Sequence, residues 1–182
     1  MMKRWAVVAV LVTVVRIADA AEPGHPLTIS LQMTNEAQVP ARVLEESQEQ
    51  VTRIFARAGL TVRWADTGPR LTVQIVPQVL GYARAGSPVM GVALRRANSA
   101  KAQIFFKQVQ DFARLHRIDA ASVLACVIAH EIGHLLLPGT AHSPTGLMQA
   151  HWDRALVHNA ATGSLTFTDA QAARMLSAVS SQ

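Results

Sequence analysis

The 182-residue chain contains a single cysteine, Cys126, so it cannot form a disulfide bond within itself. Its stability must therefore come from a buried core, with a bound metal ion as the available additional constraint. Cys126 lies in an apolar run, and we interpret it as a small buried hydrophobic residue. The sequence also has no internal repeat and no low-complexity segment, which argues against a repeat architecture.

Long apolar runs are absent except near the N-terminus. There the basic pair at residues 3–4 precedes an apolar stretch over 5–15 and the small-x-small sequence 18–20. This order is typical of a signal peptide that is cleaved after residue 20. The stretch is too short for a permanent membrane-spanning helix. Because Arg16 lies next to the apolar stretch, an uncleaved N-terminal anchor remains the alternative.

The predicted mature domain, residues 21–182, has little net charge. Residues 1–20 contain three basic residues and one acidic residue, so their removal lowers the net charge from +5 to +3. The remaining arginines are scattered, which argues against a nucleic-acid partner. No second apolar run of spanning length follows. We therefore expect a soluble, exported domain, secreted or periplasmic, whose roughly 160 residues bury about two-thirds of the unfolded surface.

The apolar periodicity predicts a helix between the first two strands. Apolar and polar residues alternate over 27–33, and a helical pattern runs from Pro40 to Gly59. A helix in this place allows a right-handed crossover and parallel pairing of the strands on either side. Further strands are predicted over 60–65, 71–77, 91–97 and 102–108, a loop over 78–90, and helices over 109–116, from Asp119 or Ser122 to about Leu137, and from about Thr168. This order predicts an α+β domain with a mixed sheet packed on helices and a C-terminal helix.

The predicted helix that ends near residue 137 carries His-Glu-x-x-His at 130–134, inside an apolar run. Residues four apart on a helix point nearly the same way, so His130 and His134 would present two imidazoles from one face. Glu131 lies about 100° around the helix, beside the pair, where its carboxylate can reach a metal-activated water. An amphipathic helix with solvent-facing polar residues fits poorly, because the flanks are apolar and buried polar groups need partners. The pattern therefore predicts a zinc site.

A catalytic zinc site needs three protein ligands and an open position. Pro138 disfavours helical geometry at the residue before it, and Gly139 can adopt positive φ and turn the chain back under the helix. This turn favours His142 as the third ligand. The alternatives for the third ligand are His151, Asp153 and His158.

These residues resemble the motif of the metzincin clan of zinc endopeptidases, His-Glu-x-x-His-x-x-Gly-x-x-His followed by a methionine-containing turn. Residues 130–134 match the first half, residues 139–142 match Gly-x-x-His, and Met148 matches the turn methionine. The sequence "HSPTGLM" is most similar to matrixins, in which a serine commonly follows the third histidine. The chain departs from the motif by two extra residues, because the glycine and the third histidine lie five and eight residues after His134.

The resemblance implies a zincin-like fold and a zinc endopeptidase that acts on proteins or peptides, and the predicted signal peptide adds that it is exported. It implies zinc ligands at His130, His134 and His142, with Glu131 as general base and acid and Met148 as an apolar floor that does not bind the metal. It also implies that the strand over 91–97 pairs with an extended substrate. Two alternatives remain open. The first is a zinc site completed by Asp153, and the second is a zincin-like binding module without peptidase activity.

Overall fold

A computed structural model describes residues 26–65, 71–78, 89–96, 99–137, 139 and 142–181. The predicted signal peptide over residues 1–20 lies outside the described residues, as does most of the predicted loop over 78–90. Within the described ranges, none of the helices has the length and hydropathy that a bilayer span requires.

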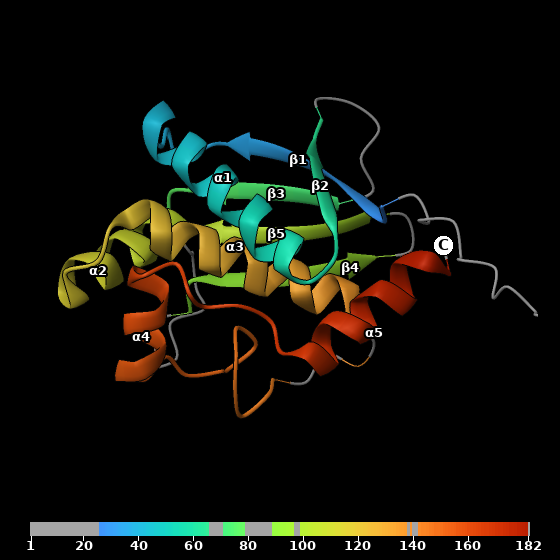
Figure 1. The fold of residues 1–182 in the computed structure, drawn as a ribbon. Coiled ribbons are helices and arrows are strands. Elements are labelled where there is room, and N and C mark those ends of the chain that lie inside the picture. The colour runs from blue at the N-terminus through green and yellow to red at the C-terminus, as the bar shows by residue number, and fades with distance from the viewer. Residues whose placement is uncertain are drawn as a thin grey trace, which may run out of the picture.

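The described chain folds into five strands and five helices (Figure 1). In chain order they are β1 (Thr28–Asn35), α1 (Ala41–Arg57), β2 (Thr61–Trp64), β3 (Leu71–Val76), β4 (Gly91–Arg96), β5 (Ser99–Phe105), α2 (Phe106–His116), α3 (Ala120–Leu136), α4 (Arg154–Ala161) and α5 (Asp169–Ser180). The predicted α+β class is confirmed.

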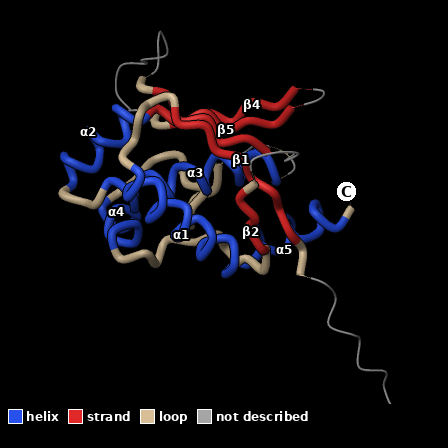
Figure 2. The backbone as a smooth tube through the Cα atoms, turned by 90° about the horizontal axis from the view of Figure 1, so that it is seen from above, coloured by secondary structure: helices blue, strands red, loops and turns tan. Residues whose placement is uncertain are grey.

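The strands form one mixed sheet in the order β2-β1-β3-β5-β4. Strand β1 pairs in parallel with both β2 and β3, and β3 pairs in parallel with β5. Helix α1 therefore connects two parallel neighbours, as the sequence predicts. Strand β4 pairs antiparallel with β5 and forms one edge of the sheet. Seen from above, the helices gather on one side of the sheet (Figure 2).

The core lies between this sheet and helices α1 and α3. In β3 the buried residues Leu71, Val73 and Ile75 alternate with partly exposed Thr72 and Gln74. This period of two is expected for a sheet with one covered face. Helix α3 is buried along nearly its whole length, and it contacts β4, β5, α1, α2, α4 and α5. A helix that is apolar all round is expected at the centre of a domain.

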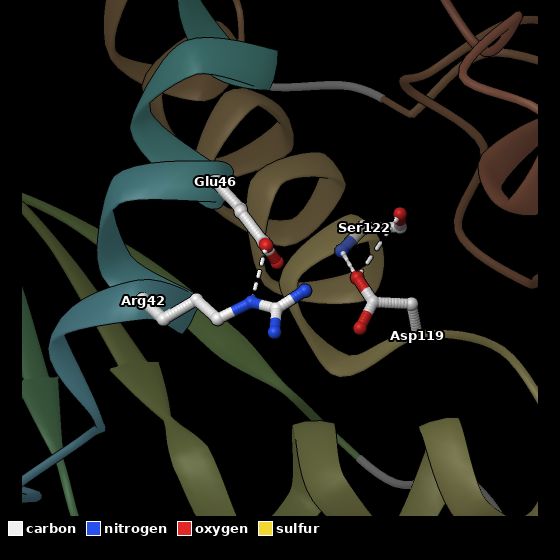
Figure 3. A network of polar contacts seen from close by, with 4 residues as sticks. All are labelled: Arg42, Glu46, Asp119 and Ser122. Atoms are coloured by element: carbon white, nitrogen blue, oxygen red, sulfur yellow. Dashed lines mark hydrogen bonds and ion pairs between the residues drawn. The ribbon is translucent and has the colours of Figure 1, made fainter.

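The start of α3 lies beside the start of α1. Asp119 is the N-cap of α3, and its Oδ2 accepts a hydrogen bond from the backbone N–H of Ser122 at 3.0 Å. Figure 3 shows this cap facing Arg42, whose Nε donates to Glu46 Oε1 at 2.7 Å. The hydrogen bond to Glu46 raises the pKa of the Arg42 guanidinium, and the nearby Asp119 charge adds to the effect. Of the two predicted caps, Asp119 is therefore the one used.

Two predictions about secondary structure are wrong. The strand predicted over 102–108 ends at Phe105, and α2 begins at Phe106. The apolar residues there are compatible with a strand or a helix. The sheet ends at this point, where the backbone N–H of Lys107 donates to the carbonyl of Pro77 at 2.9 Å. Helix α4 lies between the helix predicted to end at about Leu137 and the one predicted to begin at about Thr168, where the sequence predicts no helix. It buries only Leu156 and Ala160, so its periodic signal in the sequence is weak.

The Cys126 thiol is fully buried in α3, as predicted, and burial raises its pKa to about 12. Its thiolate fraction at pH 8 is then at least about 1,000-fold below that of an exposed cysteine. We expect a disulfide reagent such as DTNB to react with the native protein at least that much more slowly than with the protein in guanidinium chloride. Since the chain has one cysteine, the reaction has a single possible target. Equal rates in the two conditions would show that Cys126 is accessible.

Candidate metal centre

The His-Glu-x-x-His residues lie in the last two turns of α3. His130 and Glu131 are 8% and 7% exposed, and His134 is half-buried. The helix ends where the sequence predicts, because Leu137 has extended backbone angles with ψ 128°. Gly139 has the expected positive φ, +73°. The chain then brings His142 back to the face of α3 that carries the histidine pair.

Three imidazole nitrogens converge at this point. His134 Nε2 lies 3.1 Å from His130 Nε2 and 3.3 Å from His142 Nε2. Nitrogens bound to one tetrahedral zinc ion at about 2.1 Å are separated by about 3.4 Å. The spacing therefore fits a single metal ion. Among the described residues, these three form the one group of at least three potential metal ligands whose atoms lie within 4.8 Å of one another.

The protonation of the rings also suits a metal. His130 Nδ1 lies 2.8 Å from the carbonyl oxygen of Leu147. A carbonyl only accepts, so Nδ1 carries the proton and the Nε2 lone pair faces the cluster. Burial lowers the pKa of His130, and it lowers that of His134 to about 4, with the neighbouring histidines adding to the effect. Burial thus favours the neutral, metal-binding form of the two helical histidines, and the three converging nitrogens fit a metal ion such as zinc.

The other candidates for the third ligand are not brought to the pair. Asp153 is the N-cap of α4, and its Oδ1 accepts a hydrogen bond from the backbone N–H of Leu156 at 2.8 Å. His151 and His158 are exposed, and neither belongs to the three-histidine group. The structure thus places His142, and none of the other three, next to the helical pair.

Met148 packs directly against α3 beside the histidines. A Cβ atom built on Gly133 would lie 2.5 Å from Met148 Sδ and 2.9 Å from Phe167 Cε1. A glycine fits at position 133 because Met148 and Phe167 occupy the space that a larger side chain would need. Our sequence analysis missed both Gly133 and Phe167. The sequence feature that could have indicated this contact is a glycine inside an apolar helix. Glycine destabilises a helix by about 1 kcal/mol relative to alanine, so its presence there implies a packing reason.

The segment 143–148 forms a turn under the histidines. The backbone N–H of Ser143 donates to the carbonyl of Met148 at 2.9 Å, and Gly146 has a φ of +73°. Leu147 donates its N–H to Thr166 at 2.9 Å, while its carbonyl accepts from His130. One residue of the turn thus links the ring of His130 to the segment before α5.

Glu131 lies against the first residue of the edge strand β4. A Cβ atom on Gly91 would lie 2.8 Å from Glu131 Cγ and 2.9 Å from its Oε1. Burial raises the pKa of the Glu131 carboxyl to about 8. Farther along β4, Arg95 donates a hydrogen bond to the carbonyl of Leu135 in the last turn of α3. The strand is therefore joined to α3 at both ends of the histidine motif.

No family model and no curated protein matches this sequence. Among solved structures, metalloproteinase-II from Bacteroides fragilis is similar, with a TM-score of 0.52 and 14% sequence identity. The match covers 85% of this chain and 54% of that one, so the chain spans about half the length of the structure that it matches. It shows that a five-stranded mixed sheet packed on helices is a fold that this chain shares with a metalloproteinase.

Replacement of Gly133 by alanine tests the packing of the turn. Alanine favours the helix by about 1 kcal/mol, but its methyl group would overlap Met148 and Phe167. We expect Gly133→Ala to lower the free energy of unfolding by about 1–3 kcal/mol, as measured by urea denaturation. Adding Met148→Ala should relieve the overlap, so the double variant should lose less than the sum of the two single losses. A Gly133→Ala protein more stable than the wild type would contradict this packing.

Proposed function

We propose that this protein is an exported zinc endopeptidase, with a signal peptide over residues 1–20 and secretion or periplasmic localisation. The observation that carries the proposal is the convergence of three imidazole nitrogens, 3.1 and 3.3 Å apart, beside a buried carboxylate. The fold shared with a metalloproteinase supports it. The finer resemblance, to metzincins and among them to matrixins, rests on the motif over residues 130–148.

In this proposal His130, His134 and His142 hold one zinc ion. Three ligands leave a position open, as catalytic zinc sites require. When bound, zinc supplies Lewis acidity that lowers the pKa of water to about 7 and polarises the substrate carbonyl. The carbonyl of Leu147 holds the ring of His130 in the required tautomer, as outer-shell groups commonly do for metal-ligating histidines.

Glu131 acts as general base and then as general acid. Its carboxylate takes a proton from the attacking water while the water oxygen bonds to the peptide carbonyl carbon. When the carbon–nitrogen bond breaks, Glu131 gives that proton to the leaving amine. Burial against Gly91 makes the carboxylate a stronger proton acceptor, and the positive charge of a zinc ion at the three histidines would favour the ionised form that a base needs.

The substrate class is protein or peptide, and the edge strand β4 is the proposed binding element. In the described residues no strand pairs with its outer edge. An extended peptide can add to such an edge through main-chain hydrogen bonds. Because β4 begins at Gly91 beside Glu131, a peptide paired there would lie close to the proposed base.

Metal analysis of the purified protein, together with a peptidase assay, tests the proposal. We expect one zinc per chain and an activity that a chelator removes and zinc restores. His142→Ala should weaken zinc binding by more than about 100-fold, because loss of a ligand exceeds the 10- to 100-fold typical of outer-shell changes. Asp153→Ala, the matched control, should keep zinc while losing the α4 cap. The reverse result would assign the third ligand to Asp153.

The same assay includes Glu131→Gln, which keeps the shape of the side chain but cannot accept the proton. We expect it to bind zinc normally and to cleave casein about 100- to 10,000-fold more slowly. Unchanged cleavage would remove Glu131 from the mechanism. A wild-type protein that binds zinc and cleaves no peptide would instead favour the binding module without peptidase activity.

Gly91→Ala tests the contact between β4 and the base. The added methyl group would overlap Glu131, and a displacement of about 1 Å can cost roughly 100-fold in rate. We expect kcat to fall by about 10- to 100-fold with zinc content unchanged. If the effect acts through Glu131, adding Gly91→Ala to Glu131→Gln should cause no further loss. An additive loss in the double variant would show that Gly91 acts elsewhere.

A further inference from the structure

Ser143, which directly follows His142, is hydrogen-bonded to helix α5. Its hydroxyl donates to the carbonyl of Thr145 at 2.5 Å and accepts from Gln171 Nε2 at 2.8 Å. The hydroxyl therefore uses its one proton within the turn and one lone pair toward α5. This contact joins residues that are 28 positions apart in the chain.

The side-chain amide of Gln171 is held at both ends. Its Oε1 accepts a hydrogen bond from the backbone N–H of Thr168 at 2.9 Å, and its own backbone N–H donates to Thr168 Oγ1 at 3.3 Å. This is a capping box at the start of α5. A flipped amide would place a donor against the Thr168 N–H, so the NH₂ group has to face Ser143. Gln171 is 7% exposed, so solvent offers little competition for this contact.

Two further contacts dock the same turn on the segment before α5. Leu147 donates its N–H to the Thr166 carbonyl at 2.9 Å, and a Cβ atom on Gly146 would lie 2.9 Å from Thr168 Cγ2. His142 itself is exposed, so burial does not hold its ring. The contacts nearest to it along the chain are those of Ser143, whose backbone N–H donates to the Met148 carbonyl and whose hydroxyl bonds to Thr145 and Gln171.

We propose that Gln171 is a positioning residue for the metal centre, which acts through Ser143 to hold the backbone beside the third zinc ligand. The inference rests on the proposed function, because it takes His142 as a ligand. The helix holds His130 and His134 at a fixed spacing, whereas His142 lies eight residues beyond His134 after a turn. A ligand on such a segment loses conformational entropy when it binds metal, and a pre-formed anchor reduces that loss.

Four single variants separate positioning from simple stability. Ser143→Ala removes the acceptor and leaves the capping box of α5 in place. Gln171→Ala removes the donor together with one half of the capping box. Thr168→Val is the matched control, because it removes the capping hydroxyl but keeps the Cγ2 atom near Gly146 and leaves the Gln171 amide facing Ser143. Ser143→Thr retains a hydroxyl and serves as the conservative variant.

The first readout is zinc affinity, measured by competition with a chelating indicator. The second is the visible absorption of the protein loaded with Co²⁺ in place of zinc. We expect Ser143→Ala and Gln171→Ala each to weaken zinc binding by about 10-fold and to alter the cobalt spectrum. The double variant should bind zinc about as tightly as whichever single variant has the lower zinc affinity. Thr168→Val should lower the melting temperature and leave both metal readouts at their wild-type values. Ser143→Thr, which keeps the hydroxyl, should also match the wild type in both metal readouts.

The outcomes distinguish failure of this inference from failure of the proposed function. If wild-type protein binds zinc and both Ser143→Ala and Gln171→Ala bind it equally well with unchanged cobalt spectra, the positioning role is wrong. It is also wrong if Thr168→Val loses as much zinc affinity as Gln171→Ala. If the wild-type protein binds neither metal, or if His142→Ala binds zinc as tightly as the wild type, the proposed metal site itself is wrong.

Discussion

The arrangement of the whole site depends on three imidazole nitrogens that converge on one place. A cation at the centre would satisfy all three nitrogens at once, whereas a hydrogen bond between two rings would satisfy only one pair. Burial favours the neutral form of His130 and His134, which is the form that binds a metal ion. The hydrogen bond between His130 and Leu147 orients one ring of this arrangement. The surrounding structure holds the three rings in place.

Helix α3 supplies the rigid part of that support. Its apolar residues are buried against β4, β5 and four other helices, so the two histidines it carries have little freedom to move apart. The close contact of Gly133 with Met148 and Phe167 brings the turn against the helix one residue before His134. The contact of Gly91 with Glu131 does the same for the edge strand. At both positions a glycine allows an approach that any larger residue would prevent.

The third histidine is held in a different way. His142 is exposed and lies after the end of α3, so its position depends on hydrogen bonds of its neighbour Ser143 and on the turn that Leu147 fixes to Thr166. Two histidines of the cluster thus come from a packed helix and one from an anchored turn. His130 and His134 lie four residues apart within the helix, and His142 follows eight residues later, beyond the helix end.

The sequence by itself determined the features that depend on local periodicity and end signals. These include the strand alternation, the amphipathic α1, a cap of α3 at Asp119 or Ser122, the start of α5 after Thr168 and the two histidines one turn apart. Only the tertiary structure decided the strand order, the choice of His142 over Asp153 at the cluster, and the contacts of Gly91 and Gly133. It also revealed α4, because a helix with only two buried residues leaves too weak an apolar pattern in the sequence to predict it. The physical reason is that periodicity records which face of an element is apolar, whereas the meeting of residues far apart in the chain depends on how those faces pack.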